Sequence, residues 1–377
     1  MKKFILIPDS FKGTLSSKEI CQILSNKINE VFGECEIISI PVADGGEGSV
    51  DCFLSAMGGK VVNVVCKNPF FEDMQSFYGI TDNNVGIVEM ATSAGLPLAE
   101  NRKNPKITTT YGVGQQILHA VKSGVKEIIV GLGGSCTNDF GCGAACACGV
   151  KFFDKNGKSF IPVGQTLIDV AKIDLSGLDH SIKNANITAM CDIQNTPFGE
   201  FGAAKVFAAQ KGANEQDIAL LDEGVKHLCD LIKKDFGVDL SNLNGGAAAG
   251  AFGAGMSFFF SAKLKSGIET VLDEVGFDNI ISGATAIFTG EGKIDGQSLM
   301  GKVVIGISQR AKKQNVPVIA IVGGAEGNLD GAYDKGVTSI FAINRLPQDF
   351  SISKNYSREN LSNTAGDILR LIKRFTL

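Results

Sequence analysis

The sequence has 377 residues and a formal net charge of −4 at pH 7, with 44% hydrophobic and 20% charged residues. This length favours two domains, and the composition allows large buried cores and excludes a disordered or fibrous chain. The charge provides no basic field for nucleic acid. The first apolar run is too short for a signal peptide, and no stretch is long enough to cross a membrane.

Ten cysteines without regular spacing are typical of reduced thiols, so we expect a cytoplasmic protein. Cys142, Cys146 and Cys148 lie close together in the sequence, but none of the three histidines is near them. A zinc site stays open there, and small buried core residues are the favoured interpretation.

The N-terminal segment alternates apolar runs with polar loops. Ser16 and Glu19 form a capping box, which predicts that a helix begins at about Ser17. The strand–helix–strand order predicts a parallel sheet with right-handed crossovers. The expected elements are a strand over 3–7, a helix over 17–29, a strand over 36–42, a helix over 49–57 and a strand over 61–66.

Acidic residues follow the first two predicted strands. Asp9 and Ser10 precede Lys12 after the first strand, and Asp44 and Glu47 flank paired glycines after the second. Ligands of open α/β sheets bind beyond the carboxyl ends of strands, so these residues predict a ligand site. Lys12 can meet a phosphate or a carboxylate as a point charge. The alternative is a solvated lysine and acidic turn formers.

The pattern changes after about residue 72. A hairpin over 75–90 introduces antiparallel pairing and marks a probable second domain. The elements that follow are a helix ending near 122, a strand over 128–130, a hairpin over 151–158, a strand over 187–191 and an amphipathic helix over 215–236.

A glycine-rich loop follows the strand at residues 128–130. Gly133, Gly134 and Ser135 are expected to lead into a helix, whose free N–H groups and dipole favour an anion. Asn138 and Asp139 add polar groups that suit a phosphorylated ligand with a metal ion. The alternative is a tight turn whose glycines serve only packing.

The parallel pattern resumes near residue 284. Gly290, Glu291 and Asp295 follow the strand over 284–288. The segment Gly296–Lys302 spells G-x-x-x-x-G-K, but valine replaces the magnesium-binding hydroxyl residue, so we interpret the match as coincidence. Further elements are a helix over 303–314, strands over 316–322 and 339–343, and a helix over 360–375. We therefore predict one parallel-sheet domain from 1–72 plus 284–377, and an inserted domain over 73–283.

Six blocks together resemble the type-1 glycerate kinase family of bacteria, in the family's order and over nearly the whole chain. They are Pro8–Ser17, Pro41–Ser49, Gly131–Gly143, Cys191–Ala203, Gln210–Ala213 and Thr289–Lys302. The sequence departs from the family at Cys136, Phe140, Ala209, Lys293 and Val304. Lys293 stands where arginine is common, and lysine cannot form the bidentate fork that arginine forms. The resemblance implies an α/β fold, with a second α/β domain inserted into a Rossmann-like, three-layer parallel-sheet domain.

The resemblance also implies ATP-dependent phosphorylation of D-glycerate with Mg²⁺, the 2-phosphate being the expected product. Phosphorylation at the 3-hydroxyl or of another small hydroxy acid stays open, as does a non-catalytic carboxylate-binding protein. A phosphatase or mutase is disfavoured because Asp9 and Asp44 lack a D-x-D context. We expect no nucleic-acid or membrane partner, and a homo-oligomer stays open.

The implied roles are divided among the strand-end residues. The catalytic candidates are Asp192, Asp44 and Lys12, with either aspartate as the base, and the substrate-binding candidates are Asp9, Ser10, Lys12 and Glu47. The nucleotide- or phosphate-binding candidates are Gly133, Gly134, Ser135, Asn138, Gly290 and Glu291, and the metal candidates are Asp295 and Asp139. Each carboxylate can instead cap a helix. We also predict that Lys12, Asp44, Ser135, Asp192 and Asp295 line one cleft.

Overall fold

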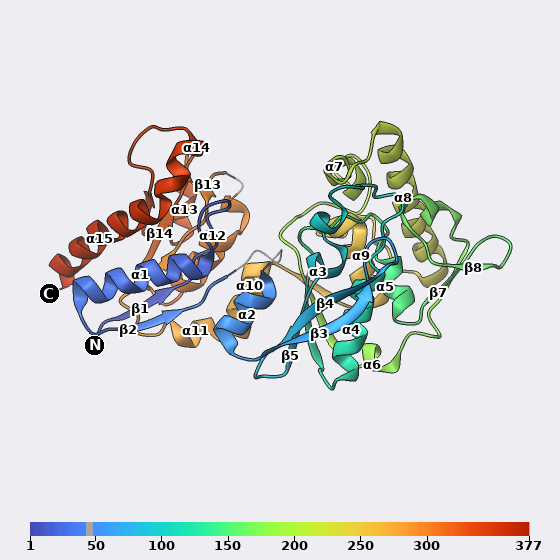
Figure 1. Cartoon of the computed structure of the whole chain (residues 1–377), viewed down its shortest axis with the longest axis horizontal. Coiled ribbons are helices and arrows are strands. Elements are labelled where there is room, and N and C mark those ends of the chain that lie inside the picture. Colours follow the sequence, from blue (N-terminus) through green and yellow to red (C-terminus); the bar gives the residue numbers. More distant parts are fainter. Residues whose placement is uncertain (43–47, 297, 377) are drawn as a thin grey trace. The chain divides into compact units, whose positions relative to one another are not determined.

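The computed structural model describes residues 1–42, 48–296 and 298–376, which form two compact units. Unit 1 comprises Met1–Asp44 and Ile268–Leu377, and unit 2 comprises Gly45–Gly267. In Figure 1 the blue N-terminal strands and the orange-to-red C-terminal elements share unit 1. The first boundary between the units lies after Asp44 and not after residue 72 as predicted. The second lies before Ile268 and not before residue 284.

Unit 1 is built on a five-stranded sheet in the order β16-β14-β12-β1-β2, with parallel pairing throughout. The strands are β1 (Lys3–Leu6), β2 (Glu36–Ser39), β12 (Ala286–Thr289), β14 (Val318–Val322) and β16 (Ser339–Ala342). The chain runs outward from β1 to β2, and outward in the other direction from β12 to β16. The junction between β1 and β12 is therefore a topological switch point, where ligands of such sheets bind.

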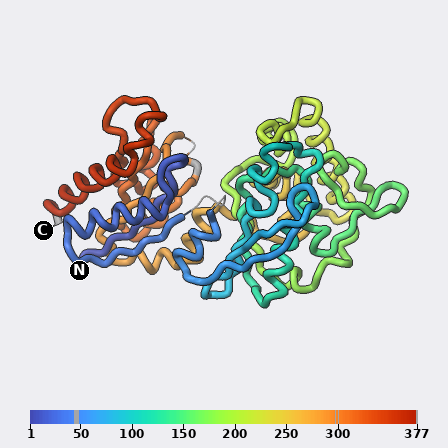
Figure 2. Tube along the Cα trace, viewed as in Figure 1, coloured from blue at the N-terminus to red at the C-terminus, as the bar shows by residue number. Residues whose placement is uncertain are grey.

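Helices cover both faces of this sheet. The alternating side chains of β14 divide between two cores, because Ile319 and Ile321 pack with α1 (Ser17–Phe32) and α15 (Ser357–Thr376). Ala320 and Val322 pack on the opposite face with α12 (Val303–Lys312) and α13 (Asp330–Asp334). Figure 2 shows the first and last helices running side by side. The predicted three-layer α/β architecture is confirmed.

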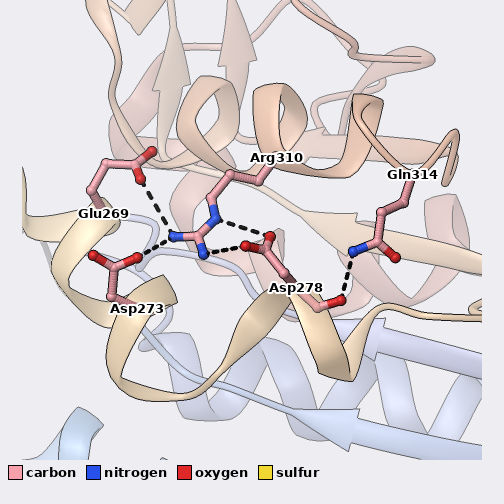
Figure 3. Close-up of polar contacts among 5 residues, drawn as sticks. All are labelled: Glu269, Asp273, Asp278, Arg310 and Gln314. Atoms are coloured by element: carbon pink, nitrogen blue, oxygen red, sulfur yellow. Dashed lines mark hydrogen bonds and ion pairs between the residues drawn. The ribbon is translucent and has the colours of Figure 1, made fainter.

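Arg310 forms hydrogen bonds and ion pairs that connect three helices of unit 1 (Figure 3). Its guanidinium on α12 donates two hydrogen bonds to Asp278 of α11 (Phe277–Ile280), at 3.1 and 2.7 Å. It also pairs with Asp273 at 2.6 Å and Glu269 at 3.4 Å, both on α10 (Gly267–Glu274). Asp278 and Asp273 raise the pKa of Arg310, which stays charged.

Unit 2 contains a six-stranded mixed sheet in the order β11-β10-β6-β5-β4-β3. Its strands are β3 (Lys60–Lys67), β4 (Asp73–Ile80), β5 (Val85–Glu89), β6 (Glu127–Gly131), β10 (Asn186–Met190) and β11 (Lys263–Lys265). The antiparallel pairing of β4 with β5 confirms the hairpin predicted over 75–90. The prediction that residues 61–66 join the parallel sheet of the other domain is wrong, because β3 pairs antiparallel with β4. The connection 68–72 is too short for a parallel crossover, which needs a dozen residues or more.

The remaining elements complete the two units. The helices are α2 (Ser49–Met57), α3 (Ala91–Ala94), α4 (Tyr111–Lys122), α5 (Cys142–Ala147), α6 (His180–Lys183), α7 (Ala203–Phe207), α8 (Glu215–Phe236), α9 (Ala248–Phe259) and α14 (Phe350–Ser353). The short strands are β7 (Lys151–Phe153), β8 (Ser159–Phe160), β9 (Lys172–Asp174), β13 (Lys293–Ile294) and β15 (Gly324–Ala325). None of the helices in the described ranges combines the length and apolar character of a membrane span.

The core of unit 2 includes Cys142 and Cys148, and Cys146 packs against it. All ten cysteines are free thiols. Burial raises the pKa of Cys146 to about 12, so this thiol stays protonated at neutral pH. The interpretation as core side chains is confirmed for Cys142 and Cys148, while Cys146 is only partly buried.

Candidate functional site

The switch point of unit 1 brings two predicted site residues together. Asp9 follows β1 and Glu291 follows β12, and the N–H of Asp9 donates to the carbonyl of Gly290 at 2.8 Å. The two carboxyl side chains are nearly buried, with 8% of Asp9 and 7% of Glu291 exposed. Residues far apart in the sequence therefore place acidic oxygens at the carboxyl edge of neighbouring strands.

Glu291 is buried near two other carboxylates. Burial raises its pKa to about 7, and the charges of Asp9 and Asp295 add to this effect. A hydrogen bond from Ser298 and the charge of Lys302 act in the opposite direction. Its Oε1 is buried and has no hydrogen-bond partner within the described ranges. A cation at this place would relieve both the repulsion and the unpaired oxygen.

Asp295 completes this acidic group. It exchanges hydrogen bonds with Ser298, with both N···O distances 3.3 Å. Lys293 lies 3.7 Å from its carboxylate and also pairs with Glu326. Sequence reasoning missed Ser298, because an isolated serine in a loop gives no signal before the fold places it.

The acidic group can be tested for its fit to Mg²⁺. Its ligand atoms are carboxylate oxygens, the type that Mg²⁺ prefers. Among the residues that the structure describes, no three His, Cys, Asp or Glu side chains form a metal-binding group by themselves. Mg²⁺ at phosphate-transfer sites uses one or two carboxylates together with water and substrate phosphates. One or two of the carboxylates of Asp9, Glu291 and Asp295 therefore fit a magnesium ion that is shared with a phosphorylated ligand.

The loop after β1 carries the other candidates of unit 1. Ser10 donates its N–H to Asp9 Oδ1 at 2.6 Å, and the side chain of Lys12 is exposed on the turn that follows. Gly290 has a packing role, since a Cβ there would lie 1.9 Å from the carbonyl oxygen of Ile321. The glycine allows close approach of two strand ends, so its predicted phosphate contact is not needed to explain it.

Asp139 is surrounded by hydrogen-bond donors. Its Oδ2 accepts from the N–H and hydroxyl of Thr110, both at 2.8 Å, from Gly143 N at 3.2 Å and from Thr109 Oγ1 at 3.4 Å. Its Oδ1 accepts from Gly141 N at 3.1 Å. The carboxylate is fully buried and caps the starts of both α4 and α5. This arrangement leaves no accessible oxygen for a metal ion and corrects the metal assignment of Asp139.

The position of Asp139 also differs from the prediction that the loop Gly133–Ser135 leads directly into a helix whose start binds an anion. The helix α5 begins at Cys142, well beyond the glycines, and the Asp139 carboxylate already occupies its first turn. Gly133 and Gly134 instead form a turn, in which Gly134 has a φ of 75° and its carbonyl accepts from Leu96 N at 2.8 Å.

Ser135 leads from this turn to a buried lysine that the sequence analysis did not select. Lys211 Nζ donates to Ser135 Oγ at 2.7 Å and to the carbonyl of Thr137 at 2.8 Å. Only 3% of Lys211 is exposed, and burial lowers its pKa to about 8. Its partners are 74 and 76 residues away, so spacing could not reveal the contact. The only available signal was its place in the family-like block Gln210–Ala213.

Asp192 acts as a helix cap in this structure. Its side chain is exposed, and Oδ1 accepts from the N–H of Gly267, the first residue of α10, at 2.9 Å. Its role as a base stays a prediction. Asp44 and Glu47 lie outside the described residues. The single-cleft prediction also stays a prediction, since its members belong to two units that are described separately.

Comparisons with known proteins all find similarity to glycerate kinases over most or all of the chain. The model of the glycerate kinase family matches residues 4–373. A glycerate kinase of Bacillus cereus is 39% identical over 373 residues, covering 98% of each chain. A glycerate 2-kinase of Escherichia coli is 38% identical over 343 residues, covering 90% of each. The crystal structure of a Salmonella typhimurium protein assigned as glycerate kinase 2 has a TM-score of 0.88 at 34% identity, covering 100% of this chain and 99% of that one.

Proposed function

The chain belongs to the glycerate kinase family, and from this premise we propose that it transfers the γ-phosphoryl group of ATP to D-glycerate and releases 2-phosphoglycerate. The choice of the 2-hydroxyl rests on the relative that is named glycerate 2-kinase. The observation that carries the proposal is the acidic group at the switch point of unit 1, where ligands of such sheets bind.

Mg²⁺ is part of this proposal. One or two of Asp9, Glu291 and Asp295 would hold the ion, because their oxygens are hard ligands and Glu291 Oε1 is buried without a partner within the described residues. When bound, the ion would neutralise charge on the phosphoryl group during transfer.

A lysine, an aspartate and two polar residues would supply the remaining roles. Lys12 is exposed on the loop after β1 and would bind the glycerate carboxylate or the γ-phosphate as a point charge. Asp192 or Asp44 would accept the proton of the attacking hydroxyl. Ser135 and Asn138 would contribute polar contacts from unit 2.

A coupled assay tests the reaction class. Purified protein with D-glycerate and Mg-ATP should release ADP only when both substrates are present, and chelation of divalent metal should stop the release. Glycerate binding without ADP release would identify a non-catalytic carboxylate-binding protein. Phosphate release from phosphoglycerate in the absence of nucleotide would identify a phosphatase.

The product can be identified separately. Enolase acts directly on 2-phosphoglycerate, whereas 3-phosphoglycerate first needs a mutase. We expect enolase alone to consume the product. A product that enolase consumes only after mutase is added would move the phosphate to the 3-hydroxyl.

A further inference from the structure

Among the described residues, the buried ammonium of Lys211 has two hydrogen-bond partners and both are neutral, while the Asp139 carboxylate acts on it through its charge alone. Both of them, the Ser135 hydroxyl and the Thr137 carbonyl, belong to one loop. Burying an ammonium is costly, and a hydroxyl and a carbonyl compensate it less than a carboxylate would. A lysine retained under these conditions indicates a role beyond packing.

The same loop carries further unfavourable features. Both amide atoms of Asn138 and the hydroxyl of Thr137 are buried without hydrogen-bond partners within the described part of the chain. The loop packs on a turn of α9 in which Ala249, Gly250 and Ala251 have φ values of 55°, 70° and 66°. A Cβ on Gly250 would lie 2.1 Å from the Thr137 carbonyl oxygen. Strained backbone and unpaired polar groups of this kind gather at functional sites.

We propose that Lys211 is a positioning residue, which directs the Ser135 hydroxyl to donate to an anionic oxygen of a ligand on the Gly133–Asn138 loop. Because Ser135 Oγ accepts a hydrogen bond from the ammonium, its own O–H is the donor that remains. The neighbouring positive charge strengthens that donor. The ligand class is therefore a carboxylate or a phosphate.

The choice between these two anions rests on the proposed function, which supplies D-glycerate and ATP. Titration calorimetry of each one separately, and of inorganic phosphate, measures binding without turnover. The protein forms are wild type, Lys211→Met, Ser135→Ala and the double variant, with Lys205→Met, an exposed lysine of α7, as the control. The control should bind like wild type.

We expect Lys211→Met and Ser135→Ala each to weaken the same anion by about tenfold or more, the loss typical of one charge-assisted hydrogen bond. The other anion should bind almost normally, which also identifies whether the subsite serves D-glycerate or ATP. The double variant should bind the anion with the same affinity as the single variant that binds it less tightly, because Lys211 acts through Ser135. Additive losses, or unchanged binding of every anion in a folded Lys211→Met protein, would overturn the proposal.

A Lys211→Met protein that does not fold leaves the proposal testable. Ser135→Ala keeps the hydrogen bond from Lys211 to the Thr137 carbonyl, so it should still fold, with some loss of stability because the ammonium loses one of its two acceptors, and it should lose affinity for one anion. Unchanged affinity of this variant for D-glycerate, ATP and phosphate would contradict the proposal. A wild type that binds these anions but releases no ADP would refute the proposed function and leave the role of Lys211 standing.

Discussion

Replacing Asp139 with asparagine should destabilise unit 2, because the carboxylate is the acceptor for donors at the starts of two helices. An asparagine must turn its amide N–H₂ either toward Thr110 or toward Gly141. The less costly choice keeps the oxygen on the Thr110 side and leaves Gly141 N facing another donor. One buried unpaired N–H costs about 1–3 kcal/mol, and the remaining bonds lose about 1 kcal/mol each when the acceptor becomes neutral. Relief of charge burial offsets part of this, so we expect a net loss of about 2–4 kcal/mol.

Urea unfolding followed by far-ultraviolet circular dichroism measures this loss, since the chain has no tryptophan to report by fluorescence. Amide hydrogen exchange at Thr110, Gly141 and Gly143 would locate it. The matched control is Asp154→Asn, because Asp154 also accepts two backbone N–H bonds, at 2.8 and 2.9 Å, but in an exposed turn. The control should lose less than about 1 kcal/mol. An Asp139→Asn protein as stable as the control would refute the capping role and reopen the metal assignment.

Three further predictions follow from charged groups. Because burial lowers the pKa of Lys211 to about 8, the unfolded chain holds this proton more tightly than the folded one, and stability should rise from about pH 8 to the ordinary lysine range. The Lys211→Met variant lacks that rise, of up to about 3 kcal/mol; a stability gap from wild type that is the same at pH 7.5 and 9.5 in urea unfolding would contradict the reasoning. Arg310→Met should cost about 2 kcal/mol by leaving three carboxylates facing one another, and 1 M salt should reduce the loss by screening them, as unfolding curves at two salt concentrations can test. Asp192→Asn should keep the cap on Gly267 and the fold but lose at least about 100-fold in kcat in the ADP-release assay; near-normal turnover would move the base to Asp44.

The sequence predicted helix ends well where neighbouring residues determine them. The helix predicted over residues 215–236 has the observed bounds of α8, since Asn214 caps its start and Gly237 ends it with a φ of 72°. The capping box of Ser16 and Glu19 also forms as predicted. The error at residues 61–66 has a different origin, because an apolar run does not reveal which of two sheets it will join.

The site was predictable only in part, because the sequence does not distinguish a ligand-binding carboxylate from a capping one. Glu89 ends a strand of unit 2, Asp139 and Asp192 follow two others, and all three accept N–H bonds at helix starts. Glu291 also follows a strand, yet one of its oxygens stays unpaired within the described residues. The difference depends on where the next helix begins, which only the three-dimensional structure shows.

Unit 1 is formed by two separate segments of the chain, and this affects its folding during synthesis on the ribosome. The strands β1 and β2 are made first, but the central partner of β1 is β12, which begins at Ala286. At a translation rate of about 5–20 residues per second, β12 is synthesised roughly 10–50 s after the N-terminal strands. The whole of unit 2 emerges and can fold during that interval. The apolar faces of the N-terminal strands would need protection by chaperones until β12 is made. A circular permutant that begins at residue 268 and links the two termini would make unit 1 contiguous, so it should depend less on chaperones in cell-free translation than the natural order does.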